Sequence, residues 1–307
     1  MTAKRIIILG VTASGKARLA YELARHLDAE IVSVDSMKIY RRMDIGTAKP
    51  SPEMRQARQY HMIDLVEPSD SYNVGLYYEQ AFSAIRQIES RGRRVIAVGG
   101  TALYLKALMY GLFDGPGSDE ALRQRLRHRA DAEGSAVLHR ELLHIDPVAA
   151  ERISPNDTRR IVRAHEVYQI SGKPISSFQT QFDAMKPCHP WTILGLRRSK
   201  KHESQRINAR VKKMIGAGLV AEVESLLQED SPMSQQASAA IGYAEIMEHL
   251  QGQKALEEAI EQIKINTRRL AKAQRTWYKT FTGINWLDVD ENAGIDALMH
   301  ESLPLCE

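Results

Sequence analysis

The residues whose types and spacing can do chemistry begin close to the start of the chain, in a glycine-containing loop. Residues 10–16 read Gly-Val-Thr-Ala-Ser-Gly-Lys and follow the apolar run Ile6–Leu9, while residues 18–27 have the pattern of a helix. Glycines at this spacing let backbone N–H groups approach an anion, the helix N-terminus attracts negative charge, and Lys16 can reach outer phosphates. The pattern predicts a phosphate-binding loop.

Ala17 departs from the form of this loop found in nucleotide hydrolases. That form carries Ser or Thr here, and its hydroxyl binds Mg²⁺. Alanine has no such group. The sequence therefore predicts the anion site but leaves the metal ligands unassigned.

Two more candidate residues follow apolar runs. Asp35 ends the run Ile31–Asp35 and is interpreted either as an aspartate that holds Mg²⁺ through water or as a general base facing the loop. Thr101 follows Gly99 and Gly100, where it either caps a helix or projects its hydroxyl into the same crevice. In the loop 40–50, Thr47 and Lys49 either add to an anion site or lie on the surface.

Strands and helices alternate in a way that can bring these residues together. Helical periods such as Tyr78–Ser90 lie between apolar, β-branched runs, and this alternation predicts an α/β fold with a P-loop NTPase-like parallel sheet flanked by helices. Ligands of such sheets gather at the carboxyl ends of the strands. The predicted strands are Ile6–Leu9, Ile31–Asp35, Met62–Val66, Val95–Gly99, Thr192–Leu196 and Asn285–Val289.

The texture of the chain changes from about Gly115 to Lys173, where strand-like runs disappear. One helix is expected to start at Ser118–Glu120, and another to run from a cap at Asn156–Asp157 to Gly172. We therefore expect a first part of the core in residues 1–114, a small all-helical insertion in 115–185, and a second part of the core with basic C-terminal helices in 186–307.

The last third of the chain is basic. Residues 197–213 hold eight Lys and Arg residues against the single acid Glu203. In the segment 256–281, an apolar stripe is predicted at Leu256, Ile260, Ile263, Leu270, Trp277 and Phe281. Five cations of this segment fall within about 80° of one another on a helix, and they form either a solvated face or a contact for a phosphate backbone. They are Lys264, Arg268, Lys272, Arg275 and Lys279.

Composition narrows the class of protein. The chain has 307 residues, 43% of them hydrophobic and 26% charged, with a net charge of +4 and a pI near 8.9. Cys188 and Cys306 fit no metal spacing and suggest a reducing compartment without disulfides. No apolar run approaches the length of a membrane span. We expect a cytoplasmic protein with no membrane contact.

Eight motifs, in order, resemble those of the tRNA dimethylallyltransferases over residues 5–288. The first half of the chain contributes the loop 10–16, Asp-Ser-Met-Lys-Ile-Tyr at 35–40, Met-Asp-Ile-Gly-Thr-Ala-Lys-Pro at 43–50 and Gly-Gly-Thr-Ala-Leu-Tyr at 99–104. The second half contributes Asn-Asp-Thr-Arg-Arg at 156–160, Ser-Gly-Lys-Pro at 171–174, Ala-Ile-Gly-Tyr at 240–243 and Thr-Arg-Arg-Leu-Ala-Lys-Ala-Gln-Arg-Thr-Trp at 267–277.

The resemblance implies transfer of a dimethylallyl group from dimethylallyl diphosphate to the exocyclic amine of the adenosine just 3′ of the anticodon. Its partners would be the tRNA anticodon stem-loop and the diphosphate, with Mg²⁺ as cofactor, and a monomer is expected. Asp35 would orient the amine or accept its proton, and Thr101 would support the reacting groups. The diphosphate site would comprise Gly10, Val11, Thr12, Ala13, Ser14, Gly15, Lys16 and Ala17.

The same resemblance implies tRNA contacts, and the basic helices add further candidates. Arg206 or Arg210, with Arg210 preferred, is a candidate for one more diphosphate contact. The tRNA-binding candidates are Asp35, Ser36, Met37, Lys38, Thr101, Arg123, Arg159, Arg160, Ile161, Val162, Arg163, Ile241, Gly242, Tyr243, Lys272 and Arg275.

Several positions depart from the family pattern, and three other functions stay open. Besides Ala17, the departures are Val11 in place of proline, Ala239 and Ala244 in place of basic residues, and Ala273 in place of arginine. The alternatives are an isopentenyltransferase acting on free AMP, ADP or ATP, a P-loop small-molecule kinase or NTPase, and a catalytically lapsed tRNA-binding protein. Ala17 disfavours the kinase, because phosphoryl transfer relies on a tightly held Mg²⁺.

Overall fold

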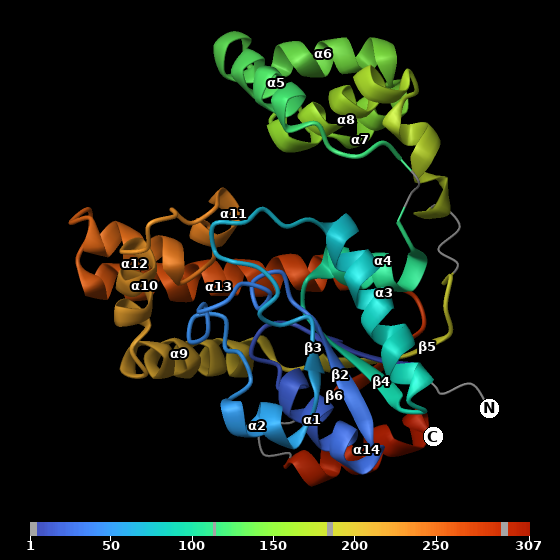
Figure 1. Ribbon diagram of the computed structural model, residues 1–307, viewed down its shortest axis with the longest axis vertical. Coiled ribbons are helices and arrows are strands. Elements are labelled where there is room, and N and C mark those ends of the chain that lie inside the picture. The colour runs from blue at the N-terminus through green and yellow to red at the C-terminus, as the bar shows by residue number, and fades with distance from the viewer. Residues whose placement is uncertain (1–4, 113–114, 183–186, 290–293) are drawn as a thin grey trace. The chain divides into compact units, whose positions relative to one another are not determined.

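The structure, a computed structural model, describes residues 5–112, 115–182, 187–289 and 294–307 (Figure 1). Residue contacts divide the chain into two compact units. One unit, here called the core unit, consists of Met1–Met109 and Pro187–Glu307, and the other, the insertion, is Tyr110–Lys186. The core unit thus contains both the glycine-containing loop and the basic C-terminal third.

A six-stranded sheet forms the centre of the core unit. Its order is β3-β2-β4-β1-β5-β6, and every neighbouring pair is parallel. A parallel sheet needs helical crossovers on its faces, so the predicted α/β class is confirmed. The strands are β1 (Arg5–Gly10), β2 (Ala29–Val34), β3 (Tyr60–His61), β4 (Arg94–Gly99), β5 (Trp191–Arg197) and β6 (Ile284–Asp288).

The strand predicted at Met62–Val66 is wrong. Strand β3 ends at His61, and Met62 and Asp64 both have left-handed backbones, with φ of 62° and 55°. A left-handed residue cannot continue a strand, so the segment turns away from the sheet. It keeps only a single bridge, between Tyr40 and Val66.

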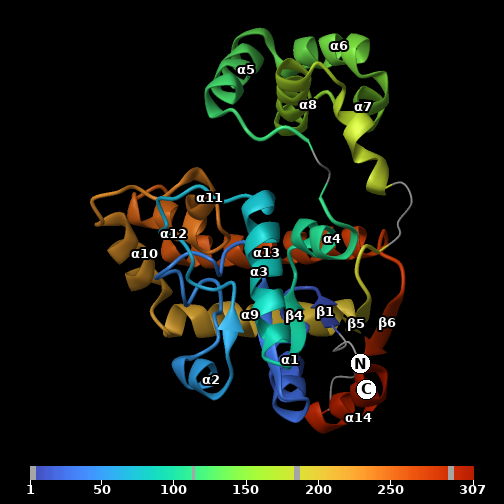
Figure 2. The ribbon, with the colours of Figure 1, turned by 45° about the vertical axis from the view of Figure 1, so that its right-hand side comes forward.

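Helices cover the sheet because their apolar faces complete its core. Leu19 and Leu23 of α1 pack with Ile6 and Ile8 of β1 and with Leu298 of α14, and α1 and α14 lie side by side (Figures 1 and 2). The helices of the core unit are α1 (Lys16–His26), α2 (Pro52–Ala57), α3 (Val74–Ser90), α4 (Ala102–Tyr110), α9 (Lys200–Gly216), α10 (Leu219–Leu227), α11 (Gln235–Ser238), α12 (Tyr243–Leu250), α13 (Leu256–Tyr278) and α14 (Ile295–Cys306). Within the described ranges, none of the helices is long and apolar enough to cross a bilayer.

The insertion is built from helices packed on two small apolar clusters. Its elements are α5 (Glu120–Glu133), α6 (Ser135–Ile145), α7 (Pro147–Arg152), α8 (Thr158–Ser171) and the 3₁₀ helix η1 (Ile175–Phe182). Asp119 caps α5, Asp157 caps α8, and Gly172 ends α8 with a φ of 68°. The predicted starts of both helices and the predicted end at Gly172 are therefore confirmed.

Candidate active site

The loop between β1 and α1 has the conformation of an anion-binding turn. The Ser14 N–H donates to the Val11 carbonyl at 3.1 Å, and Gly15 has a φ of 102°, which glycine adopts without strain. Within the described part of the chain, the backbone N–H groups of Ala13, Gly15, Lys16 and Ala17 have no hydrogen-bond partner. Such donors at a helix N-terminus are satisfied by an anion or by water.

Lys16 lies folded back on the loop. Its ammonium donates to the Val11 carbonyl at 3.1 Å. Burial of the ammonium, together with the nearby charges of Arg210 and Lys38, lowers the pKa of Lys16 to about 7. A bound anion would favour the charged form, so Lys16 is suited to respond to a phosphorylated ligand.

Three arginines donate hydrogen bonds to residues 12–14 of the loop. Arg198, after β5, donates to the Ser14 carbonyl at 2.8 Å, and Arg206 of α9 donates to the Ala13 carbonyl at 2.7 Å. Arg210 of α9 donates to the Thr12 hydroxyl at 3.0 Å. Both arginines proposed from the sequence thus reach the loop. Arg198 was not among the candidates, although its place after the strand next to β1 signals it.

Asp35 and Thr101 follow the neighbouring strands β2 and β4. Asp35 Oδ1 accepts hydrogen bonds from the backbone N–H groups of Met37 and Lys38, at 2.9 and 3.3 Å. Thr101 Oγ1 accepts from the Ser36 N–H at 3.0 Å. Because the carboxylate of Asp35 raises the pKa of both Lys16 and Arg210, it lies within electrostatic reach of the loop. The carboxylate and the hydroxyl thus follow β2 and β4, and β4 pairs with β1, the strand that leads into the loop.

Helix α13 also reaches the loop through two residues that were not candidates. Gln274 accepts from the Thr12 N–H at 2.8 Å and donates to the Gly100 carbonyl at 2.8 Å. The Tyr278 hydroxyl lies 3.1 Å from the Gly10 carbonyl and 3.3 Å from the Gly100 carbonyl. The sequence signal for Gln274 was a polar amide placed among the apolar positions of a predicted helix.

The loop 43–49 does not offer an anion site. Lys49 is buried and donates to the Tyr40 carbonyl and to the carboxylates of Asp44 and Asp64, while the Thr47 hydroxyl donates to the Met43 carbonyl. Their charge and hydrogen-bonding capacity are therefore used inside the loop. Both interpretations offered for these two residues are wrong, since they are neither anion ligands nor surface groups.

Tyr243 supports the loop 43–49 through Glu222. Its ring is fully buried, and its hydroxyl donates to Glu222 at 2.5 Å. Glu222 in turn accepts from the N–H groups of residues 44–46. Since Gly242 is also buried, Ile241 is the half-buried residue among these three predicted tRNA contacts.

The predicted tRNA-binding segment of the insertion has two faces. Ile161 and Val162 point into an apolar cluster, so their side chains face protein. Arg159 and Arg160 are exposed on the first turn of α8. Arg123 and Arg163 both pair with the buried Glu166, at 3.0 and 2.6 Å. The exposed charge of this segment therefore lies at Arg159 and Arg160.

The predicted stripes on α13 need correction. Leu270 is 41% exposed, whereas Ile263 and Phe281 of the predicted apolar stripe are buried, and the buried face of the helix also holds Ala259, Ala271, Gln274 and Tyr278. Three of the five cations have partners, because Lys264 pairs with Glu261, Arg268 donates to Asn208 and Arg275 pairs with the buried Glu203 of α9. Acids therefore pair with two of the five cations, one acid on α13 itself and one on α9, and the choice between a solvated face and a phosphate contact stays a prediction.

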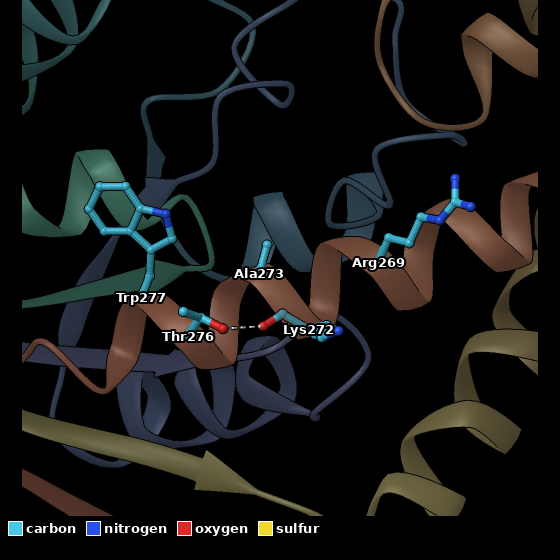
Figure 3. Close-up of a pocket in the computed structure, with 5 residues that line it drawn as sticks. All are labelled: Arg269, Lys272, Ala273, Thr276 and Trp277. Carbon is cyan, nitrogen blue, oxygen red and sulfur yellow. Dashed lines mark hydrogen bonds between the residues drawn. The ribbon is translucent and has the colours of Figure 1, made fainter. Parts of the chain in front are cut away.

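An open pocket remains on α13, with a volume of about 360 Å³ (Figure 3). Trp277 and Arg269 stand at its two ends, and Ala273 lies between them. Lys272 and Thr276 complete the lining, and the Thr276 hydroxyl donates to the Lys272 carbonyl at 3.2 Å. An aromatic ring with nearby cations is the combination that binds single-stranded nucleic acid.

The site offers few ligands to a metal ion. In the ranges that the structure describes, His, Cys, Asp and Glu residues form no cluster of three or more suited to a metal. Ala17 is exposed at the start of α1 and carries no oxygen. The carboxylate of Asp35 is the anionic oxygen ligand within reach of the loop, and its Oδ2 accepts no hydrogen bond from a described residue. This set suits Mg²⁺ held mainly by phosphate oxygens and water.

A parallel α/β fold with unpaired N–H groups in the loop after its first strand is typical of P-loop-type proteins, which bind phosphorylated ligands. A family model described as IPP transferase matches residues 38–281. The chain belongs to the IPP transferase family, so the expected resemblance and the expected class of enzyme, a prenyltransferase, are confirmed.

Relatives support this assignment along nearly the whole chain. The chain is 44% identical to tRNA dimethylallyltransferase 2 of Geotalea uraniireducens, over 94% of this chain and 93% of that protein. It is 45% identical to the tRNA dimethylallyltransferase of Geobacter metallireducens, over 92% of each.

Solved structures are similar as well. The full-length tRNA isopentenylpyrophosphate transferase of Bacillus halodurans is 35% identical, with a TM-score of 0.71 over 99% of this chain and 97% of that chain. A eukaryotic dimethylallyltransferase, described as acting on tRNA, is 26% identical, with a TM-score of 0.82 over 98% of this chain and 78% of that chain.

Proposed function

We propose that this enzyme transfers a dimethylallyl group from dimethylallyl diphosphate to the exocyclic amine of the adenosine just 3′ of the anticodon in tRNA. The observation that carries the proposal is the loop of residues 10–17, whose unpaired N–H groups and Lys16 lie within electrostatic reach of Asp35. The names of the relatives support the same substrates.

The reaction breaks one bond and forms another at the same carbon. The C–O bond of the donor breaks as diphosphate leaves with the bonding electrons, the amine nitrogen forms the new N–C bond, and the amine loses a proton. Negative charge grows on the leaving diphosphate, and loop N–H groups with Lys16 stabilise it most when it is largest. An exocyclic aromatic amine is hardly basic, so Asp35 orients it and receives its proton late in the reaction.

Mg²⁺ is proposed as the cofactor. When bound, it would neutralise part of the charge on the diphosphate, held mainly by phosphate oxygens and water, which leaves Asp35 Oδ2 for the proton of the amine. The protein's own contribution is to hold the loop and Asp35 on either side of the reacting carbon.

The acceptor is proposed to be a nucleotide turned out of the anticodon loop. A base stacked within the anticodon loop cannot present its amine to the half-buried carboxylate of Asp35, so it must leave the stack. The exposed Arg159 and Arg160 and the pocket with Lys272 and Trp277 supply cations and an aromatic surface for the surrounding phosphates and bases. We further propose that a monomer binds one stem-loop, and a cytoplasmic location stays a prediction.

The direct test is a nucleoside analysis of tRNA incubated with the enzyme, Mg²⁺ and dimethylallyl diphosphate. We expect one adenosine per acceptor tRNA to gain the mass of one isopentenyl group. Omission of the diphosphate is the control. An unchanged nucleoside profile with folded enzyme would contradict the proposal.

A further inference from the structure

Gln274 and Tyr278 face away from the exposed pocket of α13. They lie one helical turn apart on the buried side of the helix, and Gln274 is 8% exposed and Tyr278 2% exposed. Their neighbours Lys272, Ala273 and Thr276 are exposed. Burial of an uncharged amide and a phenol is costly unless their polar atoms find partners. Both residues find them in the active-site loops rather than in their own helix.

The amide of Gln274 bridges two loops that follow neighbouring strands. Its oxygen accepts from the Thr12 N–H after β1, and its nitrogen donates to the Gly100 carbonyl after β4. Because one partner is a donor and the other an acceptor, only one orientation of the amide satisfies both. The Tyr278 hydroxyl lies within hydrogen-bond distance of the Gly10 and Gly100 carbonyls and so spans the same two loops.

These contacts join the two halves of the proposed reaction. Gly10 and Thr12 belong to the loop that takes the diphosphate, whereas Gly100 precedes Thr101, which holds Ser36 beside Asp35. The contact at Gly100 is close, since a Cβ built there would lie 2.5 Å from the amide nitrogen of Gln274. Helix α13 therefore packs against the turn after β4 without room for an additional methyl group at Gly100.

We propose that Gln274 and Tyr278 are positioning residues, which fix the diphosphate loop relative to the turn that carries Thr101 and thereby set the distance between the leaving group and the amine. This rests on the proposed function. Reacting atoms must come within about 3–3.5 Å along the line of displacement, and an error of about 1 Å can cost 100-fold in rate. The two residues act through the loops and do not touch the substrates.

The test replaces each group with a close apolar analogue. Gln274→Met keeps the size of the side chain and removes both hydrogen bonds, and Tyr278→Phe removes only the hydroxyl. Gln262→Met is the matched control, because Gln262 lies on the same helix and its one side-chain partner among the described residues is Asn266 of that helix. Gly100→Ala attacks the same contact from the other loop, since its Cβ would displace the Gln274 amide. For each variant, kcat, KM for both substrates, tRNA affinity and melting temperature are measured.

We expect kcat per folded enzyme to fall at least tenfold in Gln274→Met and Gly100→Ala and less in Tyr278→Phe, with tRNA affinity within threefold of wild type. Gln262→Met should match wild type. If Gln274→Met keeps wild-type kcat, or loses tRNA affinity in step with activity, the positioning role is wrong. Should Gln274→Met fail to fold, unchanged kcat in Tyr278→Phe and Gly100→Ala would overturn it. An inactive wild-type enzyme would contradict the proposed function instead.

Discussion

At the scale of single residues, the charge state of Lys16 should differ between the free enzyme and the enzyme with bound diphosphate. Free of ligand, it donates to its own loop and its pKa is lowered to about 7, but a diphosphate needs its positive charge. Since binding restores the charged form, a proton is taken up whenever the pH lies above about 7 and below the pKa of the complex. The affinity for dimethylallyl diphosphate should therefore fall by up to about tenfold per pH unit above 7.

Calorimetry at pH 8 in two buffers of different ionisation enthalpy measures this uptake. We expect close to one proton per diphosphate bound, and less than half a proton in Lys16→Met. Equal binding enthalpies in the two buffers for the wild type would show that Lys16 is already charged before the ligand arrives.

The catalytic and structural roles of Asp35 can be separated by mutation, because its Oδ1 bonds backbone N–H groups while the charge of the carboxylate is needed for the reaction. Asp35→Asn keeps an oxygen for the Met37 and Lys38 N–H groups while it removes the charge. We expect the transfer rate to fall by about 10²–10⁴-fold, the range for loss of a general base, with tRNA affinity within about threefold. Single-turnover rates and tRNA titrations measure both quantities, and a parallel loss of affinity would make Asp35 a binding residue.

The absence of a side-chain hydroxyl at Ala17 should affect the Mg²⁺ concentration that the enzyme needs. A hydroxyl at this position would add a direct ligand, so Ala17→Thr should lower the Mg²⁺ concentration needed for half-maximal rate. Ala17→Val, which has the same shape without the hydroxyl, is the control. The same Mg²⁺ dependence in both variants would place residue 17 outside the metal's coordination sphere.

At the scale of the element, α13 has two working faces. The buried face carries Gln274 and Tyr278 to the active-site loops, and the open face carries the pocket with Lys272 and Trp277 (Figure 3). Helical periodicity predicted the helix but assigned Leu270 to the buried face. Periodicity reports which side chains are apolar, and it cannot report that a polar amide has partners elsewhere in the chain.

A cation added at Ala273, on the open face of α13, should strengthen tRNA binding. Ala273→Arg places a cation in the pocket between Arg269 and Trp277, so tRNA should bind more tightly. The log–log slope of affinity against salt should steepen by about one unit. Filter binding from low to moderate salt measures the slope, with Ala273→Gln as the uncharged control. An unchanged slope would mean that no phosphate comes near this pocket.

On the scale of the whole molecule, the sheet explains what sequence could and could not predict. The loop, Asp35 and Thr101 were predictable together, because each follows an apolar run and parallel strands end at one edge. The contacts of Arg198, of the pair Arg275–Glu203 and of the amide of Gln274 were not, although the places of Arg198 and Gln274 in the chain carried a signal, because the partners lie 72 to 262 residues away in sequence. Such pairings depend on the folded topology, and local spacing carries no record of them.

A comparison of acceptors tests most directly whether the enzyme transfers the dimethylallyl group to a base in tRNA. Initial rates with dimethylallyl diphosphate are measured for an anticodon stem-loop, for the same stem-loop with guanosine in place of the adenosine 3′ of the anticodon, and for free AMP. We predict isopentenyl transfer to the first alone, with the modified nucleoside identified by mass. Equal transfer to AMP, or to the guanosine stem-loop, would contradict the account.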